Sequence, residues 1–112
     1  MKARIASFAL LCWAALPVSA QRAVPEAFVR ADKGHCIACH QLPQGIGPAT
    51  RADLGPALDG AAARAMGKAK LRALITDPMA ANPDTVMPPF GRHRILEPAE
   101  IEQLVEFLHA LP

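Results

Sequence analysis

The chain has 112 residues, with 12 Lys and Arg against 10 Asp and Glu, so its length allows one small domain. Beyond residue 20 it holds ten basic and ten acidic residues, which excludes the basic excess that nucleic-acid binding requires. Aromatic residues make up only 4% of the chain, and domains with so little core material often depend on a disulfide, a metal or a cofactor.

The first twenty residues have the layout of a secretory signal peptide. Lys2 and Arg4 give a positive start, an apolar run of 12 residues follows over 5–16, and small residues precede a cleavage site after Ala20. A membrane-spanning helix needs about 20 apolar residues, so this run is too short for an anchor. We therefore predict a signal peptide over 1–20, a periplasmic domain over 21–112, and no membrane span in the mature chain.

Helices are expected at both ends of the mature chain. A short helix is predicted over 25–33, because Pro25 and Glu26 suit its first turn. Near the end of the chain, Pro98 and Glu100 follow Glu97 as an imperfect capping box, and apolar residues then repeat at helical spacing up to residue 111. This last helix is the most strongly patterned element of the sequence.

The middle of the chain alternates between loop and helix. Glycine and proline mark loops over 41–60 and 79–94, a helical turn is expected over 61–66, and a helix over 68–76 ends before Pro78. Because no alternating strand pattern occurs, the prediction is an all-α fold of three or four short helices joined by long loops. Loops this long in a compact domain normally wrap around something.

Cys36, Cys39 and His40 form the sequence C-x-x-C-H, which is the attachment motif for c-type haem. Two thiols three residues apart lie on one face of a helical turn and can each form a thioether with the same porphyrin. The imidazole beside the second thiol can then turn toward the iron. The motif predicts one covalently bound haem c, with His40 as an axial ligand.

Two other kinds of site, a redox-active disulfide and a zinc site, are built from the same residue types. A redox-active disulfide suits an exported protein, but it leaves His40 without a role and lacks a strand pattern around the motif. A zinc site needs a second pair of ligands, which the remaining histidines do not supply. Covalent haem explains the thiols, the histidine and the export segment together.

The second axial ligand is predicted to be Met87, which lies in a loop stiffened by Pro88 and Pro89. Thioether sulfur raises the haem reduction potential, as suits electron transfer. Met66 and Met79 lie beside helical segments, where methionine more often fills a core. His93 is a further candidate for the second axial ligand. In another alternative, Met87 is a core residue and the iron keeps an open coordination site, as in a haem enzyme.

A glycine- and proline-rich turn over 55–60 provides a candidate acceptor for the histidine. A ligating histidine nearly always donates its other N–H to a fixed group, and the carbonyl of Pro56 is available for this. The spacing is equally compatible with an ordinary Gly-Pro turn.

Taken together, these segments and their order resemble class I cytochrome c over nearly all of residues 24–111. The resemblance implies that His40 and Met87 are the axial ligands and that the Pro56 carbonyl orients His40. It also implies a fold wrapped around one haem.

Three segments also resemble SoxX, the monohaem subunit of the SoxAX cytochrome complexes of bacterial sulfur oxidation. They read KGHCIACHQ (33–41), LRALITDP (71–78) and NPDTVMPPFG (82–91), and the last is the most specific. The resemblance implies a SoxA-type cytochrome partner that couples thiosulfate to a carrier-protein cysteine, while this chain accepts the electrons and passes them to a downstream acceptor. This chain has no catalytic nucleophile of its own once the thiols of Cys36 and Cys39 are bound to haem. The alternative is a freely diffusing class I cytochrome c that carries electrons to a terminal oxidase.

Overall fold

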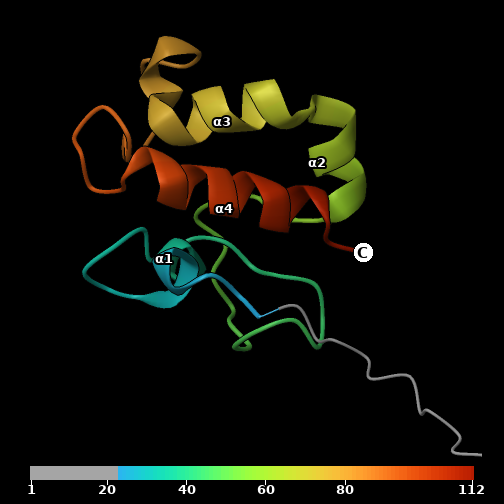
Figure 1. Ribbon diagram of the computed structural model, residues 1–112. Helices are drawn as coiled ribbons and strands as arrows, with labels where there is room; N and C mark the ends of the chain where they lie inside the picture. The colour runs from blue at the N-terminus through green and yellow to red at the C-terminus, as the bar shows by residue number, and fades with distance from the viewer. Residues whose placement is uncertain (1–22) are drawn as a thin grey trace, which may run out of the picture.

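The computed structural model describes residues 23–112, and all the regular elements of this part of the chain are helical (Figure 1). In chain order they are α1 (Glu26–Val29), the 3₁₀ turn η1 (Cys36–Ala38), α2 (Gly60–Met66), α3 (Lys68–Thr76), the 3₁₀ turn η2 (Pro78–Ala80) and α4 (Pro98–His109). The predicted all-α fold with long loops is confirmed. The predicted signal peptide lies outside the described residues.

The last helix, α4, is the centre of the core. It lies between α3 on one side and α1 on the other, and α2 packs near its end (Figure 1). Its buried residues are Ile101, Leu104, Val105, Phe107 and Leu108. Phe28 of α1 is 1% exposed and meets Phe107 edge-to-face, with the ring centroids 5.6 Å apart. The few aromatic residues of the domain are therefore concentrated around α4.

Helix α1 is shorter than predicted, since it ends at Val29 rather than at residue 33. Arg30 has an extended backbone, and its Nε donates to Asp32 Oδ1 at 2.9 Å. Residues two apart do not face each other on a helix, so this pair is available only where the helix has ended. The chain then turns through residues 31–34 and reaches the C-x-x-C-H segment.

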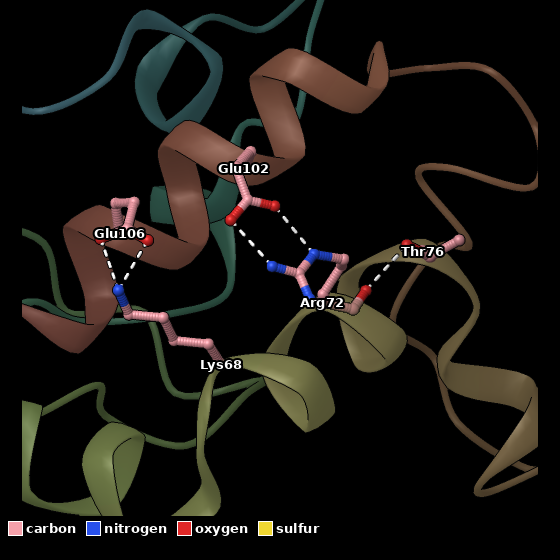
Figure 2. Close-up of polar contacts among 5 residues, drawn as sticks. All are labelled: Lys68, Arg72, Thr76, Glu102 and Glu106. Carbon is pink, nitrogen blue, oxygen red and sulfur yellow. Dashed lines mark hydrogen bonds and ion pairs between the residues drawn. The ribbon is translucent and has the colours of Figure 1, made fainter.

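Two ion pairs join α3 to α4 (Figure 2). Lys68 Nζ lies 2.7 and 2.8 Å from the two carboxylate oxygens of Glu106, and Arg72 donates two bonds of 2.8 Å to Glu102. These side chains are about half exposed, so the ion pairs contribute little to stability. The apolar residues that α3 buries against the core, Leu71 and Ile75, contribute more.

The start of α4 is tied to the segment before η1. The backbone N–H of Glu97 donates to Glu100 Oε2 at 2.8 Å, and Lys33 Nζ lies 2.9 Å from Glu100 Oε1. The N–H of Glu97, and then Lys33, hold the pKa of Glu100 below its ordinary value. The predicted capping box therefore also serves as a link between two distant segments.

Substitution of Glu100 by glutamine keeps an oxygen that can accept from the Glu97 N–H but removes the charge, and is expected to cost about 0.5–1 kcal/mol of stability at neutral pH, the usual size of a charge at a helix N-terminus together with a partly exposed ion pair. A carboxyl group with a lowered folded-state pKa stabilises the protein above its ordinary pKa, near 4.3, and loses this effect as the pH falls through the lower value. Denaturant unfolding of the haem-loaded protein at several pH values should therefore show the difference shrinking in acid. Asp84→Asn, in an exposed loop, is the control, and a difference independent of pH would contradict this role for the carboxylate.

Candidate haem-binding site

A cavity of about 470 Å³ lies between the helices and the two long loops. This volume is in the range of protein sites for cofactors and small molecules. Its wall is formed by Phe28, Gly34, His35, Cys36, Ala38, Cys39, His40, Leu54, Gly55, Pro56, Leu58, Met66, Leu71, Leu74, Ile75, Thr85, Val86, Met87, Pro88, Phe90, Leu104 and Leu108. No Asp, Glu, Lys or Arg is among these described residues, so the cavity favours a large apolar ligand.

Both cysteines of the motif line this cavity, Cys36 as the first residue of the turn η1 and Cys39 as the residue that follows it. The turn is closed by hydrogen bonds from Cys39 N and His40 N to Cys36 O, at 3.1 and 2.8 Å. Each cysteine is half-buried, and within residues 23–112 neither is in a disulfide. Burial raises the pKa of the Cys36 thiol to about 11. A thiol in such a place is a poor nucleophile for an external substrate but is well placed beside an apolar ligand.

The His40 ring is held by Pro56, near the end of the first long loop. Its Nδ1 lies 2.7 Å from the carbonyl oxygen of Pro56. A carbonyl oxygen can only accept a hydrogen bond, so Nδ1 carries the proton and the Nε2 lone pair is left for another partner. This is the tautomer that a histidine needs to bind a metal ion through Nε2.

Four further hydrogen bonds clamp residues 50–58 onto the motif segment. Thr50 Oγ1 donates to Ile37 O at 3.2 Å, and Gly55 N donates to Cys39 O at 2.8 Å. Gln41 donates through its side chain to Ala52 O and accepts from Leu58 N through its own carbonyl, both at 2.8 Å. These contacts explain how a loop without regular structure keeps a defined position next to His40.

Met87 is half-buried and lines the same cavity, and its backbone N–H donates to Thr85 Oγ1 at 3.2 Å. Of the other sequence candidates, Met79 and His93 are exposed and do not line the cavity. Met66 does line the cavity, with 38% of its surface exposed. Sequence reasoning missed this, because a methionine at the end of a helix gives no signal of the direction it faces.

The residues of the cavity fit a covalent haem. Two thiols, an imidazole whose Nε2 can act as a ligand, and the thioethers of Met66 and Met87 line one apolar cavity, and groups of these kinds attach haem c and ligate its iron. Among residues 23–112, no three His, Cys, Asp or Glu side chains are grouped so as to hold a metal ion. In the same range, no helix is long and apolar enough to cross a bilayer.

Comparison with known protein families agrees with this fit. Residues 20–108 match the family model described as cytochrome c oxidase, cbb3-type, subunit III. The chain belongs to this cytochrome c family. As a cytochrome c domain it binds haem c covalently and transfers electrons to and from partner proteins. Neither the curated proteins nor the solved structures give a match.

Proposed function

We propose that this cytochrome binds a single haem c through thioethers of Cys36 and Cys39, with His40 and Met87 as the axial ligands. The observation that carries the proposal is the pairing of His40 Nδ1 with the Pro56 carbonyl at the wall of an apolar cavity that Met87 also lines. When bound, the haem supplies a one-electron couple between ferric and ferrous iron.

In this proposal the protein has three tasks at the site. The Pro56 carbonyl keeps the proton on Nδ1 of His40, which leaves Nε2 as the ligand atom. The thioether of Met87 favours the reduced state and raises the reduction potential. Apolar residues such as Phe28 and Leu104, both 1% exposed, keep water from one side of the cavity. Among residues 23–112, no Asp, Glu, Lys or Arg lines the cavity, which suits electron transfer without bond making.

We further propose that the protein is the electron-accepting subunit of a SoxAX-like complex in the periplasm, with residues 1–20 removed as a signal peptide and residues 21–112 as the domain. Support comes from the segment 82–91, which resembles SoxX and supplies Thr85, Val86, Met87, Pro88 and Phe90 to the cavity wall. With both mature cysteines bound to haem, thiosulfate would be coupled to a carrier-protein cysteine on a SoxA-type partner. Electrons would leave through a downstream acceptor.

A freely diffusing electron carrier to a terminal oxidase is the second candidate function. The description of the matching family names a subunit of a cytochrome c oxidase, which supports electron transfer to a terminal oxidase but not free diffusion. The two candidates share the same haem site and differ only in the partner.

The haem site is tested by intact-mass measurement of the protein exported from cells with a haem-maturation system. The expected mass is that of residues 21–112 plus one haem, and the double variant Cys36→Ala, Cys39→Ala should carry no covalent haem. The mass of the bare polypeptide for the wild type would contradict the proposed site.

The partner is tested separately, by affinity purification of the tagged cytochrome from cells grown on thiosulfate. Recovery of a second haem-bearing cytochrome in equal amount supports the SoxAX-like complex. Recovery of the chain alone, still able to reduce an oxidase preparation, supports the diffusing carrier instead.

A further inference from the structure

Gly55 lies against the face of the His40 imidazole. A Cβ atom added to Gly55 would lie 2.7 Å from Nδ1 and 2.8 Å from Nε2, and closer still to Cε1. All three separations are below the distance that carbon side-chain atoms tolerate. If the added Cβ lay in the plane of the ring, along the Cε1–H bond, it would be farther from both nitrogens than 2.7 and 2.8 Å. The missing side chain would therefore occupy the space over the ring face.

The backbone at Gly55 is not free to retreat from the ring. Gly55 N donates to Cys39 O, which precedes His40, and Leu58 N donates to Gln41 O, which follows it. Between these two bonds, Pro56 O accepts from His40 Nδ1. Because bonds hold the turn on both sides of the histidine, a larger residue at position 55 would displace the imidazole.

The requirement for glycine at this position comes from space and not from the backbone dihedral angle. Gly45 and Gly67 both have φ of +84°, and a Cβ at either would meet nothing within 4 Å. Gly55 is not among the glycines with positive φ. Alanine is therefore compatible with the backbone at position 55 and incompatible only with the position of the ring.

We propose that Gly55 is a positioning residue that sets the plane of the His40 imidazole above the haem. The proposal rests on the ligation of iron by His40 proposed above. The hydrogen bond to Pro56 fixes which nitrogen faces the iron, while contact with the backbone of Gly55 blocks rotation of the ring toward one side. Groups that orient a ligand in this way determine the electronic structure of the metal centre.

The test compares Gly55→Ala with Gly45→Ala in the haem-loaded, full-length protein. The readout is the pattern of proton NMR shifts of the haem methyl groups in the ferric state, which depends on the plane of the axial imidazole. Gly55→Ala is expected to shift this pattern. Gly45→Ala is expected to keep the wild-type pattern while lowering the thermal unfolding midpoint, because alanine is strained at positive φ. A folded Gly55→Ala protein with the wild-type pattern would overturn the proposal.

A second measurement on the wild-type protein does not depend on the folding of a variant. In the ferrous state, a nuclear Overhauser contact between a Gly55 Hα and the His40 Hε1 proton is expected, and its absence would overturn the close approach. A wild type without covalent haem contradicts the proposed function itself. Attached haem with an unchanged pattern in Gly55→Ala contradicts only the role of Gly55.

Discussion

Replacing Met87 by alanine is expected to abolish the methionine–iron charge-transfer band of the ferric protein and to lower its reduction potential. The expected drop is on the order of 0.1 V or more, within the range of about 0.8 V over which axial ligands move haem potentials. The substitution removes the half-buried thioether of Met87 from the wall of the cavity. Without this thioether, the haem iron would be left with water or another weak ligand in place of Met87, and the ferric state would become relatively more stable.

Two other methionines of the described chain serve as controls for Met87→Ala. Met79 is 39% exposed and does not line the cavity, so Met79→Ala should keep both the band and the potential. Met66 lines the cavity from the end of α2 and is the structural competitor. Absorption spectroscopy and potentiometry on the three variants decide between them. A band that survives Met87→Ala and disappears in Met66→Ala would assign the ligand to Met66.

The helices that sequence periodicity predicts best are those whose buried face is set by local spacing. Helix α3 spans residues 68–76 as predicted, and α4 begins at Pro98 because a proline and a reciprocal glutamate cap define its start. The overestimate of α1 has a different origin. Arg30 pairs with a carboxylate two residues away, and Gly34 packs so close that a Cβ there would lie 2.6 Å from Ala27 O. Residues two apart do not face each other on a helix, and residues seven apart lie about 10 Å apart along its axis, so neither contact fits a helix that continues to residue 33.

The residues of the candidate site are likewise of two kinds, those that local sequence predicts and those whose role depends on tertiary packing. The motif C-x-x-C-H and Met87 are recognisable because their chemistry depends on residue type and order. The position of Gly55 over the imidazole and the entry of Met66 into the cavity depend on how segments distant in sequence close on one another. In the sequence, Gly55 indicates only a turn, and its contact with the His40 ring is visible only in the structure. Packing of this kind is invisible in one sequence.

Gly60→Ala gives the strongest test of how the fold closes, because helix propensity and packing predict opposite signs. Gly60 is the first residue of α2, where alanine would ordinarily stabilise a helix by up to about 1 kcal/mol. A Cβ there would overlap the carbonyl oxygen of Leu111 and lie 2.5 Å from Arg64 Nη1. The same Nη1 donates to Leu111 O at 2.8 Å, and Gly60 N donates to Pro112 O at 2.9 Å. The substitution therefore pushes apart the contact that holds the end of the chain on α2.

We expect the packing effect to be larger than the gain in helix propensity. The free energy of unfolding should fall by roughly 2–4 kcal/mol, because of overpacking and weakened hydrogen bonds from the charged Arg64 donor. For a domain of this size that lowers the thermal midpoint by more than about 10 °C. Thermal unfolding of the haem-loaded protein, followed by far-ultraviolet circular dichroism, measures it. Ala61→Gly, at the exposed neighbouring position of α2, is the matched control and should cost at most about 1 kcal/mol. Gly60 does not line the cavity, so the haem spectrum should stay unchanged below the transition. A midpoint raised by Gly60→Ala would show that the end of the chain is not packed on α2 as described.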